Sequence, residues 1–491
     1  MQETDIFIIG GGINGAAIAS DAAGRGLSVI LCEKNDLASG TSSASTKLIH
    51  GGLRYLELYE LGLVRKALHE REILLKKAPH LITPLEFILP YEKHLRPAWL
   101  IRIGLFLYDH LAKISLPRSK KINLNKNING NGLLPKFKIG FSYYDCLTDD
   151  ARLTILNAIS AKERGALILT HHEFISAERE QNQWKIKVNH LNSEKIFYAK
   201  TLINAAGPWV NILQKKINNK KSLSIQLVKG SHIIVPRLFS GDFAYILQNR
   251  DHRIVFAIPY HDRFTLIGTT DIAFSDDIDH VKISRGEENY LCSIINQYFK
   301  NKISPNDIIS SYSGVRCLHN DHAENVSKIS RDYKLVLDTE NHLPLLTVIG
   351  GKITTHRSLA EEAINQLHPF FPNMKSAWTG TAPLPGGDFV NRDFKQFYAQ
   401  FKKTFSWLPE NLLDRYAKNY GTRANIILAD IHQLKDLGKE ITQGVYEKEL
   451  EYLIQHEWAE TAEDVLWRRT KLGLLLDQDQ QQKIETWFEN N

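Results

Sequence analysis

Apolar and polar positions at the start of the chain follow a strand–turn–helix–strand order. Residues 6–9 form a short apolar run that leads into a glycine-rich turn, and residues 16–23 are mostly alanine. A second apolar run, residues 27–32, is followed by the acidic residue Glu33. Short uninterrupted apolar runs predict strands buried on both faces, and the small residues between them predict a helix that packs closely on those strands.

Two longer segments have helical spacing. Residues 56–80 are amphipathic with a heptad-like repeat of apolar positions that ends at Pro79. Residues 151–164 form a second helical run, and Asp149 and Asp150 stand before it where N-caps belong.

Alternating and β-branched patterns predict strands in the middle of the chain. Residues 227–316 are rich in β-branched and aromatic runs such as HIIVPR and IVFAIPY, which predict a sheet with short turns. The Asn-rich stretch 120–132 predicts a solvated surface loop. Further strands are predicted at residues 167–170, 184–188, 201–205 and 343–351.

These elements together predict an α/β fold in three parts. After a helix at residues 354–366 and the Pro-Gly-rich segment 382–388, the pattern is helical to the end. We predict a discontinuous Rossmann-like dinucleotide-binding domain with an inserted β-rich substrate (cap) domain and a C-terminal α-helical domain. The expected boundaries are 1–75, 145–225 and 340–380 for the first domain, 76–144 and 226–339 for the second, and 388–491 for the third.

The glycine turn has the GxGxxG spacing of dinucleotide sites. Gly10 permits the tight turn, Gly12 lets a pyrophosphate approach the backbone, and Gly15 lets the helix pack on the strand. The free N–H groups at the start of the helix favour a diphosphate there, and Glu33 stands where a carboxylate accepts hydrogen bonds from an adenosine ribose. The strand, helix and acid are in order, so we predict a dinucleotide site.

Three further segments are candidates for the same site. A strand ends in Ala205, Ala206 and Gly207, where small residues leave room for a cofactor, although plain helix–sheet packing gives the same pattern. The glycine pair of GGKITT, residues 350–355, leads into a helix whose N-terminus could face a flavin ring. The polar loop SSASTKLIHGGLRYL, residues 42–56, is expected to form the floor of an active site, or else to cap the next helix.

Composition narrows the function classes only slightly. The 491 residues are 43% apolar and 24% charged, as in ordinary globular proteins, and the net charge of +6 is mild. The four cysteines form no CxxC pair, so we expect no metal site and no disulfide framework. No basic leader precedes the glycine turn, so we expect no signal peptide.

One segment has the pattern of a surface that rests on a membrane. No apolar run approaches the ~18 residues that a spanning helix needs. Residues 96–118, RPAWLIRIGLFLYDHLAKISLPR, place an aromatic and apolar body between basic flanks. Such a segment can lie in the headgroup plane, and it can equally be a core helix with solvated ends.

Taken together, the motifs resemble one enzyme family over nearly the whole chain. The chain is similar to the FAD-dependent (aerobic, respiratory) glycerol-3-phosphate dehydrogenases of the D-amino-acid-oxidase-like flavoprotein superfamily. HGGLRYL, KGSHIIVPR and SGVR are specific to this resemblance, whereas the glycine motif alone indicates only a nucleotide fold. The other matching segments include DDAR, NAAGPWV, AYILQN, IGTTD, RDY, GGKITT and HEWAETAEDVLWRRTK.

The resemblance implies an activity, a cofactor and partners. The family binds FAD, oxidises sn-glycerol 3-phosphate to dihydroxyacetone phosphate and passes the electrons to a membrane quinone. It also implies a homodimer that rests peripherally on the anionic cytoplasmic face of the cytoplasmic membrane without a transmembrane helix, and no nucleic acid partner. It shifts our preference for residues 96–118 from a core helix to surface attachment.

The resemblance also implies which residues form the site. Phosphate and substrate contacts are expected from Arg54, Tyr55, Thr269, Arg316, Arg331 and Lys352, although Arg316 or Lys352 could instead polarise the reacting oxygen. The expected cofactor contacts are Gly10, Gly12, Ile13, Asn14, Gly15, Glu33, Thr41, Ser42, Ser45, Thr46, Lys47, Leu48, His50, Gly51, Ala206, Gly207, Trp209, Gly351, Lys352 and Thr354.

Two histidines compete for the role of catalytic base. Oxidation of an alcohol needs a base for the hydroxyl proton, and histidine suits this because its pKa lies near working pH. His50 lies in the cofactor-proximal loop, and His232 opens a strand of the substrate sheet. We favour His50, with His232 orienting the substrate or exchanging roles.

Three alternatives remain open on the sequence. A glycerol-phosphate oxidase would hand its electrons to oxygen and make peroxide. A non-catalytic flavoprotein scaffold would not need the histidine and arginine set. An NAD-linked dehydrogenase would not need the NAAGPW and GGKITT segments.

Overall fold

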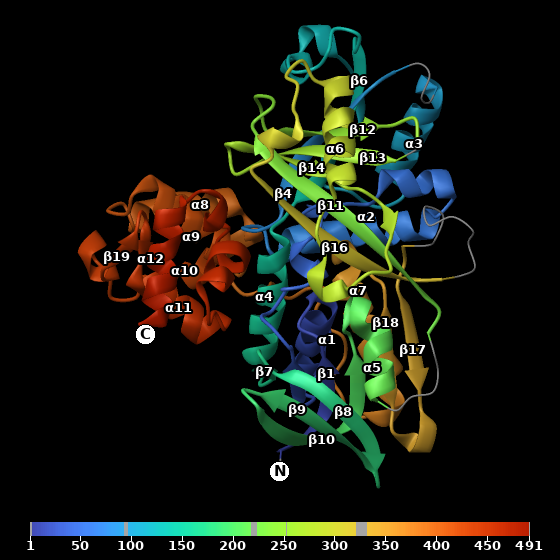
Figure 1. Ribbon diagram of the computed structural model, residues 1–491, viewed down its shortest axis with the longest axis vertical. Helices are drawn as coiled ribbons and strands as arrows, with labels where there is room; N and C mark the ends of the chain where they lie inside the picture. The colour runs from blue at the N-terminus through green and yellow to red at the C-terminus, as the bar shows by residue number, and fades with distance from the viewer. Residues whose placement is uncertain (1, 93–96, 218–222, 252, 321–330, 491) are drawn as a thin grey trace.

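The computed structural model describes residues 2–92, 97–217, 223–251, 253–320 and 331–490 (Figure 1). Two large sheets lie one above the other, and a helical block flanks them. The expected α/β architecture with a helical C-terminal part is therefore observed. In the described residues no helix is long and apolar enough to span a membrane.

The first sheet begins with the predicted strand–turn–helix. Its central order is β17–β18–β10–β1–β2–β7, and all neighbours in it are parallel except β17 and β18. A ribbon of β8 and β9 continues from β10. The strands are β1 (Gln2–Ile9), β2 (Val29–Cys32), β7 (Leu167–Leu169), β8 (Glu173–Glu180), β9 (Gln183–His190), β10 (Ser193–Asn204), β17 (Lys334–Asp338) and β18 (Leu345–Ile349).

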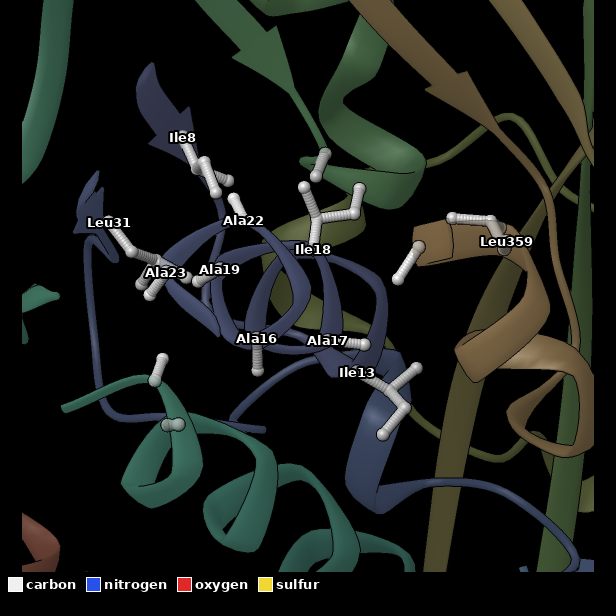
Figure 2. Packing of buried hydrophobic residues seen from close by; sticks show 14 of the residues in the cluster. Ile8, Ile13, Ala16, Ala17, Ile18, Ala19, Ala22, Ala23, Leu31 and Leu359 are labelled. Atoms are coloured by element: carbon white, nitrogen blue, oxygen red, sulfur yellow. The ribbon is translucent and has the colours of Figure 1, made fainter. Parts of the chain in front are cut away.

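Both faces of this sheet are buried, which explains its uninterrupted apolar runs. Ile6 and Ile8 face a core shared with α1 (Ile13–Gly24), α4 (Asp150–Lys162) and α7 (His356–Gln366). Phe7 and Ile9 face the opposite core, which α5 (Val210–Lys216) and the β8–β9 ribbon cover. The alanines of α1 keep this helix close to its neighbours (Figure 2).

The second sheet carries the predicted β-rich insert. Its order is β15–β11–β14–β13–β12–β4–β6–β3, with β16 paired to β11 and β5 paired to β6. On one face lies α6 (Arg285–Tyr298), and on the other lie α2 (Leu61–Lys77) and α3 (Ala98–His110). The strands are β3 (Leu48–Ile49), β4 (Thr83–Pro90), β5 (Lys120–Asn123), β6 (Ile139–Leu147), β11 (Ile225–Pro236), β12 (Phe243–Gln248), β13 (Ile254–Tyr260), β14 (Phe264–Gly268), β15 (Ile272–Ala273) and β16 (Ser310–His319).

The C-terminal block has a hydrophobic core of its own and lies beside α4 (Figure 1). A hairpin of β19 (Glu440–Thr442) and β20 (Val445–Tyr446) interrupts its helices, so the expectation of a purely helical tail was wrong in this detail. The helices are α8 (Phe394–Thr404), α9 (Glu410–Tyr420), α10 (Ala424–Ile427), α11 (Glu447–Glu457), a π-helix (Asp464–Arg469) and α12 (Gln478–Glu489).

Other sequence-based expectations also differ from the structure. Residues 120–132 are not simply a solvated loop, because Ile122 and Leu124 are buried and the Asn123 side chain accepts a hydrogen bond that closes a 3₁₀ turn. The 227–316 region contains α6, which Ser284 and Glu287 start with a capping box. The expected domain boundary at 339/340 separates β17 from β18, although the two strands pair in one sheet.

Candidate functional site

A cavity of about 890 Å³ opens where the carboxyl ends of β1, β2, β10 and β18 meet the second sheet. Ligands of open α/β folds bind at this edge because the loops that leave parallel strands converge there. Glycine turns line the cavity on one side, and residues of β12, β13 and β16 line it on the other. The site is therefore built at the boundary of the two sheets.

The first glycine turn is shaped for close backbone approach. Gly10 has a φ of +111°, and a Cβ atom there would lie 2.8 Å from the Ala205 carbonyl oxygen. A Cβ atom on Gly15 would lie 1.9 Å from the Gly10 carbonyl oxygen. Gly12 is the N-cap of α1 and supplies no capping side chain; the Ser42 hydroxyl instead accepts a hydrogen bond from the Ile13 N–H at 2.9 Å, and the start of the helix lines the cavity.

The acid at the end of β2 is held beside this turn. Glu33 accepts hydrogen bonds from the backbone N–H of Gly11 at 2.7 Å and of Asn35 at 3.0 Å. Burial raises the pKa of Glu33 above its ordinary value, and these N–H groups oppose the rise. Glu33 lines the cavity. Asp36 follows it three residues later in the same loop.

Asp150 shapes the polar loop between the two sheets. Its carboxylate accepts hydrogen bonds from the Ser45 backbone N–H at 3.0 Å, the Ser45 hydroxyl at 2.7 Å and the Lys47 ammonium at 2.7 Å. Lys47 is thereby turned away from the cavity and is buried. Asp149 is the N-cap of α4, as expected, but Asp150 acts on the loop.

The two histidines occupy different environments. His50 lines the cavity, with its ring edge-on to Phe256 at a centroid distance of 6.3 Å. Burial, together with the positive charges of Lys352, Arg71 and Arg316, lowers the pKa of His50 to about 3. Its imidazole is therefore neutral at ordinary pH.

His232 lies behind the cavity wall. Only 1% of this residue is exposed, and it does not line the cavity. Its Nε2 atom is 2.9 Å from the Thr46 hydroxyl, and its ring stacks on Tyr312 at 4.9 Å. Burial holds the pKa of His232 well below its ordinary value. This histidine can act on the cavity through Thr46, which does line it.

Four cationic side chains line the wall near His50: Arg54, Arg316, Arg331 and Lys352. Asp271 binds Arg316 at 3.1 Å and Arg331 at 2.8 Å. The four cationic side chains therefore outnumber the one carboxylate, Asp271, that pairs with them in this part of the described wall.

Two polar atoms of this wall are left without partners. The Lys352 Nζ atom lies 3.5 Å from the centre of the Tyr55 ring. Lys352 Nζ and Arg331 Nη1 are buried without a hydrogen-bond partner among the described residues. Buried cationic donors without acceptors are costly, so this wall is suited to an anionic ligand.

Most of the expected site residues come together in this one cavity, and five do not line it. Gly15 packs under Gly10, Lys47 turns to Asp150, and Gly51 donates its N–H to the Tyr108 hydroxyl at 2.8 Å. Thr354 holds the backbone of His50 through its hydroxyl, and His232 contacts Thr46. These five support the cavity from behind.

Sequence reasoning missed several residues that the cavity uses. Asp271 stands in the IGTTD segment, and its position directly after two threonines was the available signal. Phe256 faces His50 from β13, and nothing in the sequence marks it. Arg468 reaches the cavity from the C-terminal block, at a sequence distance that no local pattern reveals.

The residues present fit an FAD molecule. The N-terminus of α1 lines the cavity, where the Ile13 N–H donates to the Ser42 hydroxyl at 2.9 Å, and a carboxylate follows β2 for a ribose. The glycine pair Gly350 and Gly351 lies against Asn14, whose amide donates to the Gly350 carbonyl at 3.0 Å. The described residues contain no group of three metal-ligating side chains.

Comparison with known proteins adds two family matches. Residues 5–357 match the family described as FAD-dependent oxidoreductase. Residues 377–487 match the C-terminal domain of alpha-glycerophosphate oxidase.

Individual relatives match over nearly the full length. A glycerol-3-phosphate dehydrogenase of Pseudomonas aeruginosa is 50% identical, covering 99% of this chain and 95% of that protein. A D-erythritol 1-phosphate dehydrogenase of Brucella abortus is 46% identical, covering 100% and 98%. The solved structure of a glycerol-3-phosphate dehydrogenase from Bacillus halodurans complexed with FAD has a TM-score of 0.78 at 26% identity, covering 99% and 94%.

Proposed function

Because this chain belongs to the family of FAD-dependent oxidoreductases, we propose that it oxidises sn-glycerol 3-phosphate to dihydroxyacetone phosphate. FAD, when bound, supplies the acceptor for the two electrons that leave the alcohol. The observation that carries the proposal is the cationic wall beside a neutral histidine, because a phosphorylated alcohol needs both.

The cationic wall would bind the substrate phosphate. Arg316 and Arg331 are fork-shaped donors that Asp271 orients, Arg54 adds a third guanidinium, and Lys352 adds a point charge. Each charge-assisted hydrogen bond to the phosphate contributes roughly 1.5–3 kcal/mol. A phosphate oxygen would also give Lys352 Nζ the acceptor that the described residues do not supply.

His50 would accept the hydroxyl proton at an imidazole nitrogen. The pKa of about 3 reflects burial of His50 and the positive charges of Lys352, Arg71 and Arg316 around it. A bound phosphate dianion would offset those charges and raise the pKa of His50 toward the range that suits a general base. His232 would position the Thr46 loop, and Arg316 or Lys352 would polarise the reacting oxygen.

The cofactor would be held by backbone and by a few side chains. The N–H groups at the start of α1 would contact the diphosphate, and Glu33 would accept from the ribose. The backbone of Gly351 and Lys352 would lie against the ring at the entrance to α7.

Anaerobic substrate titration tests this function. FAD-loaded protein is mixed with glycerol 3-phosphate, and loss of the oxidised flavin absorbance is followed in a stopped-flow instrument. D-Erythritol 1-phosphate is the second substrate, because a relative of similar identity carries that name. If D-erythritol 1-phosphate reduces the flavin faster, it is the substrate in place of glycerol 3-phosphate. If neither ester reduces the flavin, the proposed dehydrogenase activity is rejected.

We further propose that the protein docks on an anionic membrane surface and passes its electrons to a quinone. Helix α3 buries Ile101, Leu105 and Tyr108 in the second sheet's core. Its other face exposes large apolar side chains: Trp99 is 64% exposed and Phe106 is 60% exposed, beside Leu100, Ile103 and Leu107. Arg96, at the edge of the predicted segment, lies outside the described residues.

Positive charge beside α3 supports this docking. A cleft between α2 and the chain after α3 is lined by Arg65, His69, Lys113 and Arg118. In the part of the chain that the structure describes, no ion pair is formed by Arg65, Lys113 or Arg118. Exposed aromatic side chains next to unpaired cations are typical of interfacial segments.

Two measurements test the electron acceptor and the assembly. Quinone reduction in the presence of vesicles, compared with peroxide formation in air, separates the dehydrogenase from an oxidase. The family resemblance suggests a homodimer on the cytoplasmic face of the membrane, and sedimentation velocity of the detergent-solubilised protein tests the dimer.

A further inference from the structure

The C-terminal block reaches into the cavity that the two sheets form. Glu463 and Arg468 line the same cavity as Glu33. Both belong to the segment around the π-helix Asp464–Arg469, more than 400 residues after the glycine turn. The block therefore contributes side chains to the cofactor end of the site as well as a separate core.

Asp36 is the point where the two parts are joined. This residue is 1% exposed. Its carboxylate accepts hydrogen bonds from Arg468 Nε at 2.5 Å and from Arg469 Nη1 and Nη2 at 2.5 and 2.8 Å. Arg469 is itself fully buried and also donates to the Glu457 carbonyl. A buried carboxylate with three charge-assisted donors is held in one position.

The local helix geometry directs two consecutive arginines to one carboxylate. The Thr470 N–H bonds to the Val465 carbonyl at 3.0 Å, five residues earlier, so this turn is wider than an α-turn. Wide turns of this kind are frequent at functional sites. Here the turn lets Arg468 and Arg469 converge on Asp36.

Asp36 belongs to the loop that surrounds Glu33. The Ala38 N–H donates to the Gly11 carbonyl at 3.1 Å, and the Gly11 N–H donates to Glu33 at 2.7 Å. The loop is thus tied to the glycine turn on one side and to the C-terminal block on the other. A shift of Asp36 would be transmitted to Glu33 and to the backbone beside α1.

Other polar contacts also join the block to the same region. Glu460 accepts from the Thr170 hydroxyl at 3.1 Å, directly after β7. Lys471 pairs with Asp149 at 3.2 Å, and Glu457 pairs with the fully buried Arg152 of α4. The contacts follow the edge of the first sheet from β2 to α4.

We propose that the C-terminal block is part of the FAD site, with Arg468 and Arg469 as positioning residues for its adenosine end. The arginines hold the loop around Glu33 through Asp36, and Arg468 closes the wall of the cavity there. The inference rests on the FAD-dependent function proposed above. It gives the helical block a role in cofactor retention that its separate core does not reveal.

The test measures FAD affinity in variants of the full chain. Arg469→Met removes two of the three bonds to Asp36, and Arg469→Lys restores one charged donor. Apoprotein is titrated with FAD, and quenching of flavin fluorescence gives the dissociation constant. We expect Arg469→Met to raise this constant by about tenfold or more, with partial recovery in Arg469→Lys.

Arg415→Met is the matched control. Arg415 pairs with the buried Glu449 wholly inside the C-terminal block, so this variant also loses a partly buried ion pair. Both variants should lower the melting temperature of the apoprotein, but only Arg469→Met should weaken FAD. If Arg415→Met loses as much FAD affinity as Arg469→Met, the loss reflects general destabilisation of the block, and the proposal is overturned.

A second variant covers the case in which Arg469→Met does not fold. Arg468→Gln changes a side chain at the cavity wall that is 11% exposed. ADP is the second probe, because it carries the adenosine diphosphate part of FAD without the ring. We expect Arg468→Gln to weaken FAD and ADP by similar factors, and unchanged affinity for both would overturn the proposal. Wild-type protein that binds no FAD would instead reject the proposed function itself.

Discussion

Lys352→Met is the perturbation for which the structure predicts the most distinctive combination of effects. The ammonium group lies over Tyr55, has no hydrogen-bond acceptor among the described residues and is among the charges that lower the pKa of His50. Removing it should therefore weaken phosphate binding, raise the pKa of His50 and remove an unfavourable buried charge. No single alternative role for Lys352 predicts all three changes.

The size of the first effect follows from one charge-assisted contact. A loss of roughly 1.5–3 kcal/mol corresponds to a fall of roughly 10- to 150-fold in kcat/KM. The fall should be confined to phosphorylated substrate. With Arg316 polarising the reacting oxygen, glycerol, which lacks the phosphate, should be oxidised slowly and at a rate that Lys352→Met changes little; an equal fall for glycerol would assign the polarising role to Lys352.

The second effect has a defined sign. Neutral His50 is the active base, so activity is lost as the pH falls through the pKa of that group. Lys352 is the first of the positive charges that lower this pKa below its usual value, so its removal raises the pKa. The acidic limb of the rate of flavin reduction should move to higher pH in Lys352→Met.

Lys77→Met is the control for loss of a buried lysine. Lys77 donates to the Thr379 and Ala382 carbonyls, so its removal should lower the melting temperature and leave the pH profile unchanged. Lys352→Met should lower the melting temperature less than Lys77→Met does, because within the described residues its ammonium lies over the Tyr55 ring and is left among the buried groups without a hydrogen-bond partner. Equal losses for glycerol 3-phosphate and glycerol, with an unmoved acidic limb, would refute the reasoning.

The remaining predictions concern the base, the Asp271 bridge and the exposed face of α3. His50→Ala should slow anaerobic flavin reduction by about 100-fold or more, since general bases contribute that much; if His232→Ala alone has this effect, the assignment of the base is wrong. Asp271→Asn should raise KM for glycerol 3-phosphate about tenfold, because Arg316 and Arg331 lose their shared anchor, and a fall in FAD content with unchanged KM would contradict this. Replacing Trp99 and Phe106 by serine should release the protein from anionic vesicles in a sedimentation assay, whereas undiminished binding would reject α3 as the docking surface.

Sequence patterns correctly predicted those elements whose structure depends on residues close together in the sequence. The apolar run of β1, the glycine spacing and the small residues of α1 each have one structural solution, because a larger residue at Gly15 would collide with the Gly10 carbonyl. The Asn-rich stretch was misjudged, because its polar side chains close turns while Ile122 and Leu124 enter the core. Composition alone cannot separate these two uses of asparagine.

The site was harder to predict where its geometry depends on distant contacts. Lys47 belongs to the right loop, but Asp150, 103 residues later, turns it away from the cavity. His232 and His50 both match motif positions, and only the packing of β11 places His232 behind Thr46. The reach of Arg468 to Asp36 spans 432 residues, which no periodicity records.

The most direct measurement for the central claim is the visible spectrum of FAD-loaded protein before and after glycerol 3-phosphate is added without oxygen. The cationic wall and His50 predict rapid loss of the oxidised flavin absorbance in wild-type protein and a much slower loss in His50→Ala. A spectrum that stays unchanged in protein with full FAD occupancy would contradict it.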